Sequence, residues 1–398
     1  MKINKVQNKI FFFLCFWLII ASLYYAPNLI EGQLLVDRDE NIVSRAAKYV
    51  IGIFFLVAYI IAYKDGRALI HGILLGILLI VFAIVELSGY NVTFGFDVLV
   101  VLLSFYGMIY IASRFNLSEI DIFGKIIIYS GFFISIISYF EYSIFESILG
   151  GFWDKTGGFR SVSTLLNPNN LGIYLSAALI LLFFSVNIKF KIKLVIGAVV
   201  VGALFLSGSR TAWFSLIIAT LFGIVYRGSG AVNVMATLRS LFFIASIAAI
   251  LFIFFYMSIF SITDRMSDPY TFLLRIEKQF QFLYNFGIDY LYPDLRESRV
   301  ALVSESGYLH LINSLGLLCA VIVLFIFLFF VRISWIQILF KSGISRAYSV
   351  LILFYFIASF FENILMSFPN NQLFFLVVGV LIASHRSQLQ KNREFHCK

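Results

Sequence analysis

The segment Ser207-Gly208-Ser209-Arg210-Thr211 brings an arginine together with a glycine and hydroxyl side chains between two apolar runs. Because almost no loop separates these runs, we expect Arg210 to lie at the end of an apolar helix. An arginine there needs a partner or solvent, and its planar fork suits a phosphate. Gly208 permits close backbone approach, and Ser209 adds a donor. The alternative is an arginine that snorkels to headgroups or pairs with an acid.

A second polar cluster combines Arg160 with Asn167-Pro168-Asn169-Asn170, directly before another apolar run. Proline and asparagine are common in turns and at helix starts, so helix capping explains the cluster equally well. Arg160 favours a binding role for the cluster, because it adds a cation beside these amides.

A third cluster holds Arg265, Arg275, Arg296 and Arg299, followed by Glu305 at the start of a long apolar run. Loop arginines are usually solvated. Glu305 is different because of its place at a helix start. A partly desolvated carboxylate suits a general base, whereas the alternative is a first-turn carboxylate that the helix dipole favours.

The elements that position these residues are membrane spans. The 398 residues are 61% hydrophobic, 18% aromatic and only 13% charged, which predicts an all-α integral membrane protein. Continuous apolar runs exclude an outer-membrane barrel, whose strands would alternate. We predict one polytopic domain over residues 1–398, with about twelve spans. They lie near residues 10–26, 46–63, 68–87, 96–113, 122–140, 171–187, 194–206, 212–226, 241–262, 306–331, 347–365 and 372–384.

Charge predicts the orientation of these spans. With twelve spans both termini share one side, and that side holds 19 of the 30 basic residues but only 4 of the 21 acidic ones. The positive-inside rule therefore predicts cytoplasmic termini. The net positive charge thus reflects the orientation of the protein in the membrane, and we expect no nucleic-acid partner.

Two external loops are long. Residues 141–170 include an apolar stretch that suits a re-entrant or interfacial segment. Residues 263–305, between spans nine and ten, contain an amphipathic helix expected on the outer membrane surface. Its apolar face consists of Phe272, Leu273, Ile276, Phe280 and Leu283.

The three clusters, in this order, resemble the superfamily of O-antigen polymerases and O-antigen ligases of bacterial envelope glycan assembly. The resemblance covers nearly the whole chain and rests on the layout of spans and on the motifs around Arg160, Arg210 and Glu305. It also includes Gly316 and, near the end, Glu362, Pro369 and Gly379. The resemblance implies a multi-pass protein of the bacterial inner membrane whose site faces the exterior.

The activity implied is transfer of a growing glycan from undecaprenyl diphosphate to a sugar hydroxyl of a new lipid-linked repeat unit, without a metal or other cofactor. Arg210 and Arg275 would hold the diphosphate, with Arg265 as the competing alignment, and Glu305 would accept the proton. The resemblance assigns binding of a glycan to Arg160, Asn167 and Asn169. A chain-length regulator is a candidate protein partner.

Within the superfamily, ligases usually carry a histidine followed by Asn, Ser or Gln, then nine residues and a glycine. This chain keeps the spacing with Ser306 and Gly316 but has Glu305 in place of the histidine. The missing histidine favours the polymerase branch over a ligase. A transporter or flippase remains an alternative, although transporters usually keep ionisable residues near the midplane. The acidic motif of a polyprenyl-phosphate glycosyltransferase is a further interpretation of the first outer loop, at Asp37, Arg38, Asp39 and Glu40, but a solvated charge run explains these residues too.

Overall fold

The computed structural model describes the chain in separate ranges, and within them the protein is all helical, without a strand. The ranges are 108–109, 112–148, 160–161, 163–165, 168–184, 188–225, 277–282, 284, 306–340, 344–364 and 370–396. The elements are α6 (Leu117–Ile148), the 3-10 turn η2 (Ser163–Leu165), α7 (Pro168–Phe184), α8 (Phe190–Ser207), α9 (Arg210–Val225), α14 (Gly307–Phe340), α15 (Ile344–Ala358) and α16 (Asn370–His396).

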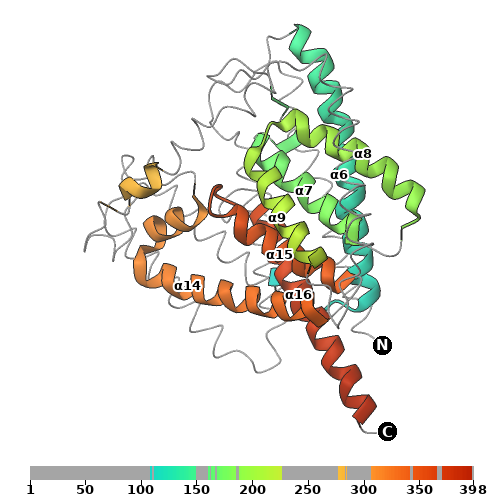
Figure 1. Ribbon diagram of the computed structural model, residues 1–398, viewed down its shortest axis with the longest axis vertical. Coiled ribbons are helices and arrows are strands. Elements are labelled where there is room, and N and C mark those ends of the chain that lie inside the picture. The colour runs from blue at the N-terminus through green and yellow to red at the C-terminus, as the bar shows by residue number, and fades with distance from the viewer. Residues whose placement is uncertain are drawn as a thin grey trace.

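Helices α7 and α15 form the centre of the bundle (Figure 1). α7 packs against α6, α8, α9 and α15, while α15 packs against α7, α9, α14 and α16. Leu171, Tyr174 and Leu175 on α7, and Tyr348 and Phe354 on α15, are almost completely buried. A helix that is apolar on every face is stable only when other elements surround it, which accounts for the central place of both helices.

Small residues let α7 and α9 approach closely. A Cβ atom added to Gly172 would lie 2.5 Å from the Cβ of Ser209 and 2.9 Å from the Cβ of Ala212. No larger side chain fits at this crossing, as is common where helices pack through small residues. The contact fixes the first turn of α9 against α7.

Hydrogen bonds gather six helix ends at one end of the bundle, here called the polar end. α7, α9, α14 and α16 begin there, and α8 and α15 finish there. The links include Asn370 to Asn170, Thr211 to Glu362, and the Gly307 amide to the carbonyl of Ser359. The residues that begin these helices are therefore neighbours in space although they are distant in sequence.

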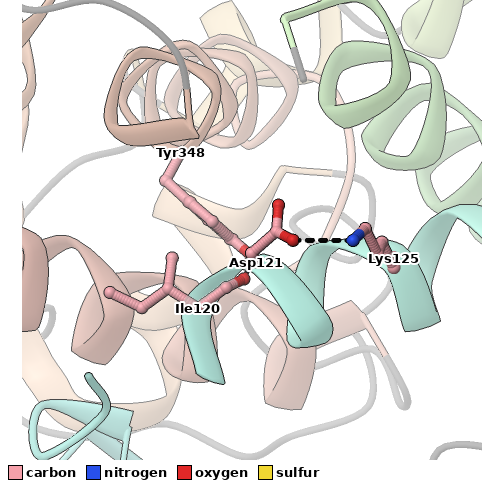
Figure 2. A network of polar contacts seen from close by, with 4 residues as sticks. All are labelled: Ile120, Asp121, Lys125 and Tyr348. Atoms are coloured by element: carbon pink, nitrogen blue, oxygen red, sulfur yellow. Dashed lines mark hydrogen bonds and ion pairs between the residues drawn. The ribbon is translucent and has the colours of Figure 1, made fainter. Parts of the chain in front are cut away.

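The opposite end of the bundle joins the start of α6 to the start of α15 (Figure 2). The Tyr348 hydroxyl donates to the carbonyl of Ile120 at 3.0 Å, and Lys125 pairs with Asp121 at 2.8 Å. The Ser384 hydroxyl of α16 donates to the hydroxyl of Ser345 at 2.7 Å. In Figure 1 the last part of α16 projects beyond the other helices from this end.

Seven of the predicted apolar runs fall on described helices. The observed helix ends differ from the predicted ends of the runs at several places. α6 continues beyond residue 140 to Ile148, and α16 continues beyond residue 384 to His396. α15 stops at Ala358, inside the predicted run 347–365, because the chain turns at Ser359 towards the start of α14. The first three predicted spans, the ninth, and most of the fourth lie outside the described residues.

Two of the described helical segments, Leu117–Ser143 and Phe190–Ser207, are long and apolar enough to cross a bilayer, which suggests a membrane protein. Large apolar side chains also face outward. Phe133 and Phe140 on α6, Phe190 on α8 and Phe325 on α14 are between 61% and 68% exposed. Exposed phenylalanines in such number are typical of a surface that contacts lipid or another protein.

Candidate functional site

The turn between α8 and α9 positions the first predicted cluster. Gly208 adopts the left-handed conformation at φ 57° and closes α8, its amide donating to the carbonyl of Phe205 at 2.9 Å. Glycine is favoured here because other residues meet steric hindrance between Cβ and the backbone. α9 then begins at Arg210, so this arginine lies in the first turn of its helix at the polar end.

Arg160 is a buried cation at the polar end. Its side chain is 7% exposed, its Nε donates to the carbonyl of Ser207 at 2.7 Å, and its Nη2 donates to Oδ1 of Asn169 at 2.7 Å. The arginine thus joins the last turn of α8 to the first turn of α7. A cation is favoured at a helix C-terminus, where carbonyl groups point outward. Arg160 also lies against Gly208, two residues before Arg210.

Glu141 holds the backbone that carries Arg160. This carboxylate near the end of α6 is buried, and its Oε2 accepts hydrogen bonds from the hydroxyl of Ser161 and, at 2.6 Å, from the amide of Ser163. The Ser161 hydroxyl also accepts from Ser138 at 2.6 Å, and the Ser161 amide donates to the carbonyl of Leu206. These contacts tie the residues beside Arg160 to α6 and α8.

The backbone of Ser163 is strained, with φ 49°, and its contacts explain how that conformation persists. Its amide reaches Glu141, and its hydroxyl donates to the carbonyl of Ile134 at 2.9 Å. Both partners lie on α6. Anchoring of this kind holds Arg160 in one place before any ligand is present.

A second carboxylate, Glu362, lies where three helix ends meet. Its Oε1 accepts a hydrogen bond from the hydroxyl of Thr211 at 3.2 Å, and its carbonyl accepts from the amide of Gly307 at 3.2 Å. Ser306, directly before Gly307, is buried. The first turn of α9, the end of α15 and the start of α14 therefore share one small region.

The long predicted loop also reaches the polar end. Residues 277–282 are helical, and the side-chain Nε2 of Gln279 donates to the carbonyl of Phe360 at 2.9 Å. Phe282 is buried against Leu309 and Ile312 of α14. Phe280, which the sequence pattern places on the apolar face, is 66% exposed.

Among the predicted site residues, Arg160, Asn169, Ser209 and Arg210 all lie at the polar end. Ser209 is 1% exposed and packs against Gly172. Its hydroxyl has no hydrogen-bond partner among the described residues. The other predicted site residues fall outside the described ranges, namely Asn167, Arg265, Arg275 and Glu305.

Sequence reasoning missed Glu141 and gave Glu362 no role of its own. The available signal was the same for both: a lone acid next to aromatic residues, in Tyr139-Phe140-Glu141 and in Phe361-Glu362. An acid in such a setting is costly unless hydrogen bonds satisfy it. The described residues contain no cluster of His, Cys, Asp or Glu suited to a metal ion.

Comparisons of the chain with protein families, with curated proteins and with solved structures find no match.

Proposed function

We propose that the protein is a polymerase of lipid-linked oligosaccharide repeat units, such as those of O-antigen or of capsular or exopolysaccharide. It would transfer the growing glycan from undecaprenyl diphosphate to a sugar hydroxyl of a new lipid-linked unit. The observation that carries the proposal is the meeting of Arg160, Asn169, Arg210 and the Ser306-Gly307 start of α14 at one end of the bundle. Those motifs are the ones that resemble the polymerase and ligase superfamily.

The proposed reaction gives chemical roles to Arg210, Arg275 and Glu305. The hydroxyl oxygen attacks the anomeric carbon of the growing glycan, the bond from that carbon to the diphosphate oxygen breaks, and undecaprenyl diphosphate leaves. Arg210 and Arg275 stabilise the negative charge that develops on the diphosphate. Glu305 takes the proton of the attacking hydroxyl.

Arg160 and Asn169 are held in place by hydrogen bonds within the protein. Ser207 and Asn169 accept hydrogen bonds from Arg160, and Glu141 anchors the neighbouring Ser161, so the guanidinium needs little reorganisation when a substrate arrives. Fixed donors are worth more than mobile ones in a water-poor site, since their orientation is set before the reaction. This arrangement supports a role in binding one glycan close to its diphosphate.

We further propose about twelve spans in the bacterial inner membrane, with cytoplasmic termini and the polar end at the outer face. The lipid bilayer and undecaprenyl-diphosphate-linked oligosaccharides are the proposed partners, with a chain-length regulator as a candidate protein partner. Support comes from the opposite end of the bundle, where Lys125, Lys191, Lys193 and Arg346 lie in the first turns or near the starts of their helices. Basic residues of this kind mark the cytoplasmic side.

The phenotype of the source bacterium lacking the gene separates the proposal from its rivals. Loss of a polymerase leaves single repeat units, whereas loss of a ligase leaves long chains on the lipid carrier. Loss of a flippase prevents repeat units from reaching the outer face. We expect single repeats in the null strain and long chains after complementation with the wild-type gene.

Replacement of Arg210 tests the role of the bidentate guanidinium. Arg210→Lys keeps the charge but removes the fork that a diphosphate requires, so we expect most long chains to disappear at equal protein level. Arg332→Lys, an exposed site on α14, is the matched control and should behave as wild type.

In the null-strain test, long chains that remain on the lipid carrier would contradict the polymerase and identify a ligase.

A further inference from the structure

The tripeptide Pro-Asn-Asn occurs twice in the chain, as Pro168-Asn169-Asn170, which begins α7, and as Pro369-Asn370-Asn371, whose two asparagines begin α16. The structure joins the two starts directly. The side-chain amide of Asn370 donates to the carbonyl of Asn170 at 3.0 Å and to its Oδ1 at 3.3 Å. We call the contact between these two helix starts the amide junction.

The amide junction lies beside the arginine of the polar end. Asn169 neighbours Asn170 in the first turn of α7, and its Oδ1 accepts the hydrogen bond from Nη2 of Arg160 at 2.7 Å. The guanidinium of Arg160 and the side-chain amide of Asn370 therefore contact consecutive residues of α7, Asn169 and Asn170.

Buried acceptors in the first turn of α16, at and beside the amide junction, are unsatisfied. Asn370 is 0% exposed and Gln372 is 3% exposed, yet Oδ1 of Asn370 and Oε1 of Gln372 accept no hydrogen bond from any described residue. Because the Nδ2 atom of Asn370 is held by Asn170, its Oδ1, on the same carbon, is held within the junction. Leaving a buried acceptor unsatisfied is unfavourable, so native proteins supply a donor from protein, water or ligand.

The chemistry of these acceptors selects a class of ligand. Amide oxygens accept hydrogen bonds and repel anions, so they suit hydroxyl groups and do not suit phosphate. Asn363 adds a third buried acceptor without a described partner, directly after Glu362 at the same end. A molecule that presents several hydroxyl groups next to a diphosphate would satisfy the amides and the arginines together.

We propose that the amide junction and the first turn of α16 bind sugar hydroxyls of the lipid-linked glycan, while the neighbouring arginines hold its diphosphate. Asn370 and Gln372 accept hydrogen bonds from hydroxyls of a sugar close to the diphosphate. This inference rests on the proposed function and deepens it, since it assigns the sugar and the diphosphate to different side chains.

Gln372→Met is the sharpest test, because methionine keeps the volume and the backbone amide while it removes the acceptor. One neutral hydrogen bond corresponds to about a three- to ten-fold change in affinity, so we expect KM for the lipid-linked repeat unit to rise by about that factor with kcat nearly unchanged. Binding of undecaprenyl diphosphate without a sugar should stay at the wild-type value. The apo variant should be at least as heat-stable as wild type, since an unsatisfied acceptor is gone.

Ser176→Ala is the matched control. This fully buried hydroxyl in the interior of α7 also has no partner among the described residues, but it lies deeper in the helix than the amide junction. Its removal should leave KM and both affinities unchanged.

The outcomes are distinct. If wild type elongates the repeat unit and Gln372→Met binds both lipids with wild-type affinity, water satisfies these acceptors and the inference is wrong while the proposed function stands. If Gln372→Met lowers the affinity for both lipids equally, the inference is also wrong, because the Gln372 side chain would then act on the diphosphate that both lipids share. If wild type neither binds nor elongates the repeat unit, the proposed function and this inference fail together.

Discussion

Replacing Gly208 with alanine should disturb Arg160 through one added methyl group. At φ 57° an L-residue other than glycine costs about 1–2 kcal/mol. The new Cβ would lie 3.2 Å from Nε of Arg160, a contact so tight that the guanidinium must move by a few tenths of an ångström. That movement weakens the 2.7 Å bond from Nε to the Ser207 carbonyl, one of a class worth about 1.5–3 kcal/mol. We expect a total loss of about 2–3 kcal/mol.

The assay is thermal denaturation of the purified protein in detergent, together with elongation of lipid-linked repeat units. Gly208→Ala should lower the Tm and reduce elongation by up to about tenfold, the factor that 1.36 kcal/mol represents. Gly197→Ala, on the same helix, is the control. Its Cβ would lie 3.6 Å from the nearest atom of Leu182, an ordinary contact. It should raise stability by about 0.5–1 kcal/mol, because alanine favours the helix interior.

A second variant separates backbone strain from the displacement of Arg160. Asparagine tolerates the left-handed conformation better than alanine does, but it also carries a Cβ. Gly208→Asn should therefore recover part of the lost Tm without recovering elongation. Full elongation by Gly208→Asn, or wild-type Tm and elongation in Gly208→Ala, would refute the view that this turn positions Arg160.

Three further predictions concern other residues. Glu141→Ala leaves the Ser163 amide without its carboxylate partner, so we expect a loss of about 2–4 kcal/mol in thermal denaturation, and an unchanged Tm would contradict the anchoring role. Glu305→Gln should stay in the membrane and bind substrate but make only single repeats, since a positioned base contributes about 10² to 10⁴ in rate; long chains at the wild-type rate would remove it as the base. A reporter fused at Asp289 should be active only outside the cytoplasm, and cytoplasmic activity would overturn the topology.

Local patterns predicted much of the described fold. The short connection at Gly208 and the helix that begins at Arg210 follow from one glycine between two apolar runs. Helix ends were harder to predict where charged residues continue a helix, as in α16, or where a contact stops it, as at Ala358. Hydropathy measures only the apolar part of a helix.

Contacts between distant residues could not be predicted from local sequence. Thr211 and Glu362 are 151 residues apart, and Asn370 is 200 residues from Asn170. Tertiary packing decides such pairs, and no local propensity encodes them. The polar character of each motif was visible in the sequence, but their meeting at one end of the bundle required the arrangement of α7, α9, α14, α15 and α16.

Reconstitution tests the proposed polymerase activity most directly. Purified wild-type protein in lipid vesicles would receive undecaprenyl-diphosphate-linked repeat units as the only substrate, with a chelator and no nucleotide sugar present. We predict a ladder of longer lipid-linked glycans, with one undecaprenyl diphosphate released for each linkage formed. Absence of any elongated product, or elongation only after a nucleotide sugar is added, would contradict the proposal.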